Sequence, residues 1–310
     1  MDGRLQIFAG NAHPGLAKAI SEELEVPLGR AEVDLWKNGE TRVKIEDNVR
    51  GSDVFVVQPT SHPVDHHLME LLLFFDALKR ASAARVTAVI PYYGYARQEK
   101  KTSGREPISA KLVANLLTVA GANRVLAVDL HAPAIEGFFD IPVDHLRATP
   151  LLARAFRRHI QDDVVVVSPD AGGVARAEDF RVRAGGSLAI ISKQHPRPEA
   201  TETLEMVGDV DGRTAVIVDD MISTGGTLVQ AAKLLQERGA AEIHVAATHG
   251  IFAADALELI EQSAIERIFV TDTVPVPAGI RRVEVVSVAP LLAEAIMRTH
   301  KGLSVSALFT

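Results

Sequence analysis

Short apolar runs of strand length alternate with amphipathic segments of helical period along the whole chain. This alternation is typical of α/β proteins built on mainly parallel sheets. The apolar runs predict strands near 4–9, 42–46, 53–58, 85–91, 124–130, 164–168, 188–192, 215–220, 242–248, 267–271 and 283–287. The amphipathic segments predict helices over 64–83, 108–120, 149–160, 226–238, 251–262 and 289–299.

Two stretches of the pattern resemble each other. Segment 109–132 matches segment 227–250 at a constant offset of 118 residues, and each runs from a helix through Gly-Ala to a strand and a histidine. The preceding strands match at an offset of 127, so one copy carries nine extra residues, which predicts a longer loop at 91–107. Any two βαβ units share some of these features, which leaves chance as the alternative. We favour a duplicated domain.

The length supports the same organisation. A chain of 310 residues suggests about two domains, each large enough for its own core. We expect a first domain over 1–148 and a second over 149–299, with the tail 300–310 packing back on the first.

Composition narrows the class of protein. With 33 Lys and Arg against 40 Asp and Glu, the net charge is −7, which disfavours polymeric nucleic acid and anionic membranes as partners. The chain has no cysteine, which excludes disulfides, thiolate metal sites and a cysteine nucleophile. No signal-like start and no apolar stretch of about 20 residues is present, so we expect a cytoplasmic protein.

The strongest chemical signal follows the apolar run at 215–218. Two acids come first, and a Ser-Thr-Gly-Gly-Thr loop then leads into a helix. Backbone N–H groups at such a turn bind phosphate, and the acids suit the hydroxyls of a ribose. The alternative is a helix cap beside two solvated acids. The candidate residues are Asp219, Asp220, Ser223, Thr224, Gly225, Gly226 and Thr227, a run similar to the ribose-phosphate signature of the type I phosphoribosyltransferases.

Two further stretches suggest a nucleotide. The bases Arg97, Lys100, Lys101, Arg105 and Lys111 outnumber the acids between 97 and 111, and a local basic patch in an acidic protein suits a polyphosphate. A solvated basic loop is the alternative. The only tryptophan, Trp36, lies in a predicted turn, where it is either a core residue or a stacking platform for a flat base.

Together these motifs resemble those of the class I ribose-phosphate pyrophosphokinases, also called phosphoribosyl pyrophosphate synthetases. The resemblance runs nearly end to end and implies two similar domains of the type I phosphoribosyltransferase kind, the first for ATP and the second for ribose 5-phosphate. The motifs that carry it are Trp36–Glu40, Tyr95–Gln98, Arg105–Leu112, Asp129–Ala132, Gly137–Asp144, Ser168–Gly173, Asp219–Thr227 and Ser304–Ser306.

The resemblance implies transfer of the β,γ-diphosphoryl group of Mg-ATP to O1 of ribose 5-phosphate, with release of AMP. It implies Mg²⁺ as cofactor, held at His131 and Asp170, and a catalytic loop around Lys193. At the position two after that lysine the family has Arg but this chain has His195, so Arg197 is the alternative source of the guanidinium. The implied ATP-binding residues are Trp36, Asn38, Glu40, Arg97, Gln98, Lys100 and Lys101.

The family also forms dimers and larger rings, and phosphate and ADP regulate it. Arg50, Ser304 and Ser306 match parts of its regulatory phosphate site. We therefore expect a dimer-based homo-oligomer, such as a hexamer. Two other functions remain open: a catalytically weakened regulatory subunit, which His195 motivates, and a phosphoribosyltransferase that acts on a base.

Overall fold

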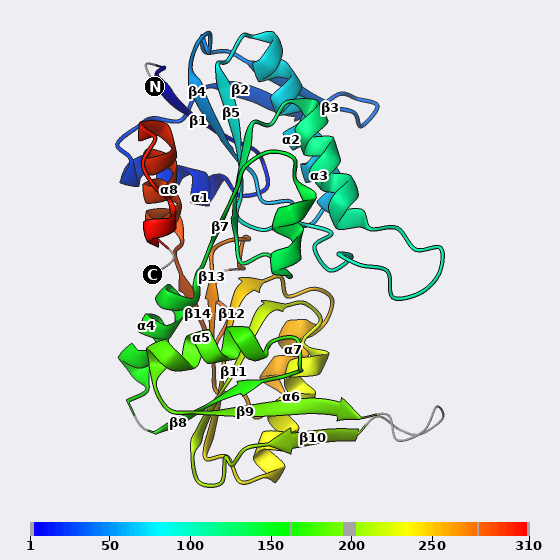
Figure 1. Ribbon diagram of the computed structural model, residues 1–310, viewed down its shortest axis with the longest axis vertical. Helices are drawn as coiled ribbons and strands as arrows, with labels where there is room; N and C mark the ends of the chain where they lie inside the picture. The colour runs from blue at the N-terminus through cyan, green and yellow to red at the C-terminus, as the bar shows by residue number, and fades with distance from the viewer. Residues whose placement is uncertain (1–2, 162, 195–202, 278, 309–310) are drawn as a thin grey trace. The chain divides into compact units, whose positions relative to one another are not determined.

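The chain divides into two compact units, each with its own sheet. Unit 1 comprises Met1–Arg147 together with Val288–Thr310, and unit 2 comprises Ala148–Ser287. The computed structural model describes residues 3–161, 163–194, 203–277 and 279–308, and gives only the backbone of Lys193, Gln194 and Thr203. Both units are parallel-sheet α/β structures, which confirms the predicted fold class (Figure 1).

Unit 1 is built on a five-stranded sheet in which all neighbours are parallel. The strand order is β1-β4-β5-β6-β7. The strands are β1 (Leu5–Ala9), β4 (Asp53–Val57), β5 (Arg85–Ile90), β6 (Arg124–Val128) and β7 (Val143–Leu146). The helices are α1 (Pro14–Glu23), α2 (Val64–Arg80), α3 (Ser109–Ala120) and α8 (Ala289–Lys301), with short 3₁₀ turns η1 (Pro133–Phe138) and η2 (Ser306–Leu308).

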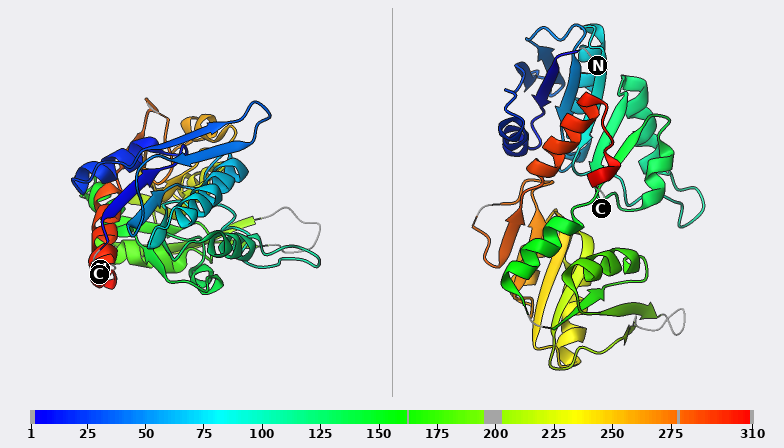
Figure 2. Two further views of the ribbon diagram at one scale, coloured as in Figure 1. Left: turned by 90° about the horizontal axis from the view of Figure 1, so that it is seen from above. Right: turned by 60° about the vertical axis from the view of Figure 1, so that its left-hand side comes forward.

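Helices cover both faces of this sheet. Alternate residues of the strands, such as Val54 and Val56, pack against α2 and α3, where Leu71, Phe74 and Phe75 are buried. Helices α1 and α8 pack against each other on the opposite face (Figures 1 and 2). The central strands β4, β5 and β6 are therefore buried on both sides, and this explains why they read as continuous apolar runs in the sequence.

A separate antiparallel hairpin lies beside α2. It consists of β2 (Ala31–Leu35) and β3 (Thr41–Ile45). Its apolar side chains, among them Val33 and Val43, pack on the core of unit 1, while the alternate residues face solvent. The turn that joins the two strands carries Trp36, as the sequence predicts.

Unit 2 is built on a seven-stranded sheet in the order β10-β9-β8-β11-β12-β13-β14, in which only the edge strand β10 is antiparallel. The strands are β8 (Val164–Ser168), β9 (Ser187–Gln194), β10 (Thr203–Val207), β11 (Thr214–Ile222), β12 (Glu242–Gly250), β13 (Arg267–Thr271) and β14 (Val283–Val286). The helices are α4 (Thr149–His159), α5 (Val174–Ala184), α6 (Gly226–Glu237) and α7 (Ala256–Glu261).

The two similar segments of the sequence occupy corresponding places in the two units. One is β5-α3-β6 and the other is β11-α6-β12, and in both the strands are parallel neighbours. Gly121 and Gly239 each follow the helix with positive φ angles of 125° and 86°, a conformation that glycine adopts without steric cost. No helix among the described residues has both the length and the apolarity needed to cross a bilayer.

The last helix differs from the expected domain division. We expected 289–299 in the second domain, but α8 belongs to unit 1. Arg85 donates to both oxygens of the buried Asp53 and to the backbone oxygen of Thr299, and His300 Nδ1 lies 2.9 Å from Asp53 Oδ2. Together with the apolar contact to α1, these bonds attach the end of α8 to the sheet of unit 1.

This attachment gives a stability prediction. We expect Asp53→Ala to lower the free energy of unfolding of unit 1 by about 3 kcal/mol, because Arg85 and His300 both lose the buried carboxylate with which they pair. Asp76→Ala is the matched control, since Asp76 pairs with Arg80 on the surface of α2, and we expect a loss of under about 1 kcal/mol. Urea unfolding measures both, and equal losses would contradict the role of Asp53.

Candidate active site

The carboxyl ends of β8 and β11 lie side by side in unit 2. The two strands are neighbours, but the chain leaves β8 toward β9 on one side and β11 toward β12 on the other. Open α/β sheets bind ligands at such a switch point, because the loops diverge there. Asp170 follows β8, and Asp219 and Asp220 lie near the end of β11. The structure thus brings three of the predicted carboxylates to one edge of the sheet.

Arg176 of α5 joins the two acids of β11. Its Nη1 lies 3.0 Å from Asp219 Oδ1 and 3.6 Å from Asp220 Oδ1. Burial and the charge of Asp220 raise the pKa of Asp219 to about 7, and Arg176 only partly offsets them. Two crowded carboxylates with one guanidinium favour a ligand that supplies hydroxyl donors or positive charge.

The predicted phosphate loop follows directly. Gly225 has a φ of +77°, which turns the chain from β11 into α6. None of the described side chains caps the first turn of α6, so its N–H groups face outward. The backbone oxygens of Ile222 and Ser223 accept bonds of 3.0 Å from Phe252 and Ala253, which fix the loop from below. The other predicted residues of this loop are Ser223, Thr224, Gly226 and Thr227.

The two candidate metal residues lie in different units. Asp170 is exposed, and its Oδ1 accepts a 2.8 Å bond from the backbone N–H of Gly173. His131 is half-buried after β6 in unit 1. Among the described residues, no group of three or more His, Asp or Glu side chains is arranged to hold a metal ion. A cation at either residue would need further ligands from substrate or water.

A buried histidine supports the corner before His131. The backbone N–H of Leu130 donates to His145 Nε2 at 2.7 Å, and Arg147 Nη1 donates to the same nitrogen at 2.8 Å. Because both partners are donors, Nε2 carries no proton and Nδ1 donates to Glu136 Oε1 at 2.5 Å. Burial lowers the pKa of His145, in keeping with a neutral ring.

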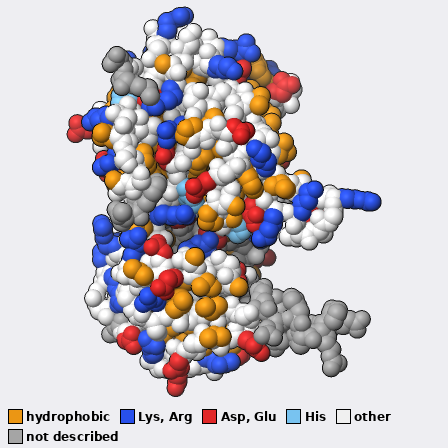
Figure 3. All heavy atoms as spheres, viewed as in Figure 1, with side chains coloured by type: hydrophobic (Ala, Val, Ile, Leu, Met, Phe, Trp, Pro, Cys, Tyr) orange, Lys and Arg blue, Asp and Glu red, His pale blue; other side chains and the backbone are white. Residues whose placement is uncertain are grey.

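The basic loop after β5 is ordered by one acid. Glu106 accepts bonds from the side chains and backbone of Thr102 and Ser103, and these bonds lower its pKa to about 2. Gln98 accepts a bond from the Ser109 hydroxyl at the start of α3. Arg97, Lys100 and Lys101 are exposed, and basic side chains reach the tip of this projecting loop (Figure 3).

Trp36 lies on the surface. It is 55% exposed, which decides against the core alternative. The backbone N–H of Trp36 donates to the backbone oxygen of Glu40, and the backbone oxygen of Trp36 accepts from the N–H of Gly39, both at 2.8 Å. The side-chain oxygen of Asn38 accepts a 3.3 Å bond from the backbone N–H of Glu40. The positive φ of Gly39, 89°, closes this tight turn.

The candidate regulatory residues all lie in unit 1. Ser304 Oγ and Ser306 Oγ lie 2.9 Å apart, and Arg298 Nη1 donates to the backbone oxygen of Ser304 at 3.0 Å. Arg50 is exposed between β3 and β4.

The candidate catalytic loop is only partly described. The backbone of Lys193 pairs with Leu204 across the β9–β10 edge. His195 and Arg197 lie outside the described residues.

Sequence reasoning missed Arg176 and His145. Arg176 lies 43 residues before Asp219, and only the pairing of β8 with β11 brings α5 to the site. His145 directly follows the motif Gly137–Asp144, but its bond to Leu130 depends on the pairing of β6 with β7. The only signal in the sequence was the neighbouring motif Gly137–Asp144, which draws attention to this part of the chain but does not assign a role to His145.

The fold defines the class of protein: an α/β protein of two parallel-sheet units, the second of which carries two acids and a glycine-rich helix start at the switch point of its sheet. Comparisons with known proteins narrow the class. Residues 5–121 match the family model described as the N-terminal domain of ribose phosphate pyrophosphokinase, and residues 189–310 match the phosphoribosyl synthetase-associated domain.

Curated relatives match over nearly the full length. The ribose-phosphate pyrophosphokinase of Caldanaerobacter subterraneus subsp. tengcongensis is 52% identical over 309 residues, which cover 99% of this chain and 98% of the relative. The Bacillus subtilis protein of the same name is 49% identical over 311 residues, with coverages of 100% and 98%. The crystal structure of the phosphoribosylpyrophosphate synthetase from Mycobacterium smegmatis superposes with a TM-score of 0.92 at 44% identity, covering 96% of this chain and 99% of that one.

The chain therefore belongs to the ribose-phosphate pyrophosphokinase family. It is an enzyme, a transferase that makes phosphoribosyl pyrophosphate. Neither alternative, a regulatory subunit or a base-transferring phosphoribosyltransferase, is favoured by these relatives.

The raised pKa of Asp219 gives a pH-dependent prediction. Between its ordinary value of 3.8 and about 7, the folded protein binds this proton more tightly than the unfolded chain, so the resulting stability is lost as the pH rises. Asn cannot ionise. We expect Asp219→Asn to gain stability relative to the parent from pH 4 to pH 7, by at most about 1.4 kcal/mol per pH unit.

Urea unfolding at a series of pH values measures this difference. Asp255→Asn is the control, because Asp255 is exposed before α7, and we expect its difference from the parent to stay flat. A flat profile for Asp219→Asn as well would contradict the crowding of the two acids.

Proposed function

We propose that this enzyme transfers the β,γ-diphosphoryl group of ATP to O1 of ribose 5-phosphate, with ribose 5-phosphate bound in unit 2. The observation that carries the proposal is the pair of acids on β11 followed by an uncapped, glycine-rich helix start at the switch point of the sheet. The loop Ser223–Thr227 holds the 5-phosphate, and Asp219 and Asp220 accept bonds from the ribose hydroxyls. Arg176 holds both acids in place.

In this proposal unit 1 binds ATP. Trp36 stacks on the adenine, with Asn38 and Glu40 beside the base, since the tight turn presents all three to solvent. Arg97, Lys100 and Lys101 bind the phosphates, and Gln98 contacts ATP from the same loop. The loop ordered by Glu106 supports this assignment, because its cations point outward.

The transferred group needs charge neutralisation more than covalent catalysis. O1 attacks the β-phosphorus, the bond from that phosphorus to the bridging oxygen of AMP breaks, and AMP leaves. Lys193 stabilises the charge that develops on the transferring group. Arg197 or His195 assists it, according to the resemblance of this segment to the catalytic loop of the family.

Mg²⁺ is the proposed divalent metal. Magnesium prefers oxygen ligands and is usually held by one or two protein groups plus phosphates and water, which agrees with a site of few protein ligands. The exposed carboxylate of Asp170 suits it, and His131 is the partner that the family pattern implies. Asp170 and His131 would hold the metal, which would supply positive charge to neutralise the phosphates of the substrate.

The enzyme works as a dimer-based homo-oligomer in the cytoplasm, and phosphate and ADP regulate it at a site that includes Arg50, Ser304 and Ser306. A chain without cysteine suits a reducing compartment. The close pair of serines on the tail supports a phosphate site.

The apolar side chains Ile108, Leu112, Leu116 and Val119 support self-association, because they are exposed at helical spacing along α3.

A coupled assay of AMP formation with Mg²⁺, ATP and ribose 5-phosphate tests the reaction and separates two roles. We expect Lys193→Ala to lower kcat about 100-fold or more with little change in KM, since it acts in the transition state. We expect Asp220→Asn to raise the KM for ribose 5-phosphate about 10-fold, the loss of a charged hydrogen bond.

The parent must form AMP only when ribose 5-phosphate is present. No activity above the Lys193→Ala variant would refute the proposal. Unchanged kinetics in Asp220→Asn would remove that residue from the ribose site.

Sedimentation tests the oligomer. We expect Leu112→Glu to shift the protein toward smaller species, because it places a charge in the proposed contact on α3. Val182→Glu is the matched control, since Val182 is 67% exposed on α5 of unit 2 and is not one of the exposed apolar residues of α3. If Leu112→Glu sediments as the parent does, α3 is not the contact.

A further inference from the structure

The solvent face of the β2–β3 hairpin carries a row of charges that leads to the tryptophan. The strand register places Glu32 opposite Lys44 and Asp34 opposite Arg42. Trp36 is the next position on the same face, since side chains alternate along a strand. Arg42 therefore has Asp34 directly across the hairpin and Trp36 as its diagonal neighbour, which a long side chain reaches.

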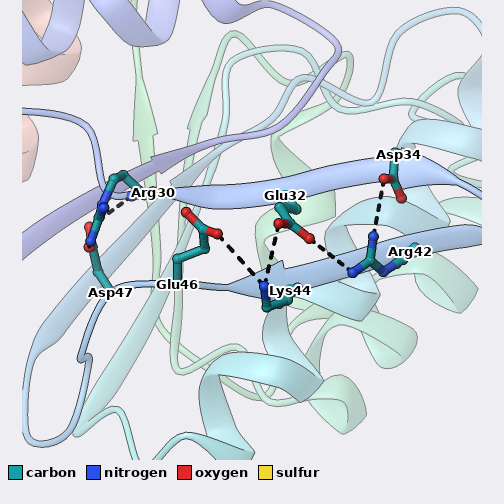
Figure 4. Close-up of polar contacts among 7 residues, drawn as sticks. All are labelled: Arg30, Glu32, Asp34, Arg42, Lys44, Glu46 and Asp47. Carbon is teal, nitrogen blue, oxygen red and sulfur yellow. Dashed lines mark hydrogen bonds and ion pairs between the residues drawn. The ribbon is translucent and has the colours of Figure 1, made fainter.

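Arg42 makes contacts in both directions. Its Nη2 donates to Glu32 Oε2 at 2.9 Å and its Nη1 lies 3.3 Å from Asp34 Oδ2 (Figure 4). The central carbon of its guanidinium lies 5.2 Å from the centroid of the Trp36 ring. This distance is within the range of a cation–π contact, and a planar guanidinium stacks well on an aromatic face. Two carboxylates thus hold the guanidinium over the ring.

The other cations of the hairpin pair further along it. Lys44 contacts Glu32 at 3.4 Å and Glu46 at 3.7 Å, and Arg30 contacts Asp47 at 2.9 Å (Figure 4). Arg42 is, among the described residues, the cation stacked on Trp36. The hairpin region therefore offers its own control, since Arg30 is an arginine that also pairs with a carboxylate but lies at the opposite end of the row, away from Trp36.

We propose that Arg42 is a positioning residue that fixes the Trp36 ring so that a purine base stacks on the face opposite the guanidinium. The inference rests on the proposed role of Trp36 as the adenine platform. A free exposed indole samples several rotamers, and a base that stacks on it must order the side chain first. Because Arg42 has already ordered the ring, less of the stacking free energy is spent on ordering it than with a free indole.

Trp36 is the only tryptophan of the chain, so intrinsic fluorescence reports on this ring alone. The experiment uses the full-length enzyme and α,β-methylene-ATP, an analogue that keeps the base and cannot transfer the diphosphoryl group. We expect its binding to quench the emission of the parent. In Arg42→Met we expect stronger quenching of the free enzyme by acrylamide and a Kd for the analogue raised about two- to five-fold, the range for one exposed cation–π contact.

Two further variants and a kinetic measurement separate positioning from general damage to the hairpin. Arg42→Lys keeps the charge but lacks the planar fork, and we expect it to raise the Kd as Arg42→Met does. Arg30→Met removes the matched cation, and we expect the values of the parent. In both Arg42 variants kcat at saturating ATP stays at the parent value, because the contact serves binding only.

Two outcomes overturn the inference, and they differ in what they say about the proposed function. If the analogue quenches Trp36 but Arg42→Met behaves as Arg30→Met does, Arg42 has no positioning role and the adenine platform stands. If the analogue leaves the emission of the parent unchanged and Trp36→Leu binds it with the parent Kd, the platform itself is wrong.

Discussion

The crowding of Asp219 and Asp220 on one strand is the constraint on which the site of unit 2 depends. Both acids lie within β11, where Asp219 still pairs with Ala247 of β12, and neighbouring residues of a strand normally face opposite sides of the sheet. Here they share one guanidinium, and burial raises the pKa of the first. The sheet order, the direction of α5 and the turn at Gly225 all serve to bring these charges beside an open helix start.

Much of the fold could be predicted from the sequence, because strands buried on both sides read as long apolar runs. The strands missed are β2, β7 and β10, each only four or five residues long and partly exposed or at a sheet edge. The helices missed are α1 and α5. The first is only ten residues long and buries only Leu16, Ala17 and Ile20, and the second is polar apart from a few buried residues.

The residues of the site likewise divide into those that could be predicted from the sequence and those that could not. Residues within one loop, such as Ser223–Thr227, could be predicted because their chemistry is local. Arg176, His145 and Arg42 could not, since each acts on a residue that only strand pairing brings near. The exposure of Trp36 was equally beyond the sequence, because an isolated tryptophan in an apolar-rich chain is more often buried. The side-chain contacts of Lys193, His195 and Arg197 stay predictions.

Unit 1 is discontinuous in sequence, and this has a consequence for synthesis on the ribosome. The sheet of unit 1 is complete by Leu146, but α8, which covers α1 and binds Asp53 and Arg85, emerges only after all of unit 2. Unit 2 is continuous and has its whole core before α8 exists. The domain that begins first is therefore finished last, and the surface of α1 that α8 covers stays exposed until the final helix leaves the exit tunnel.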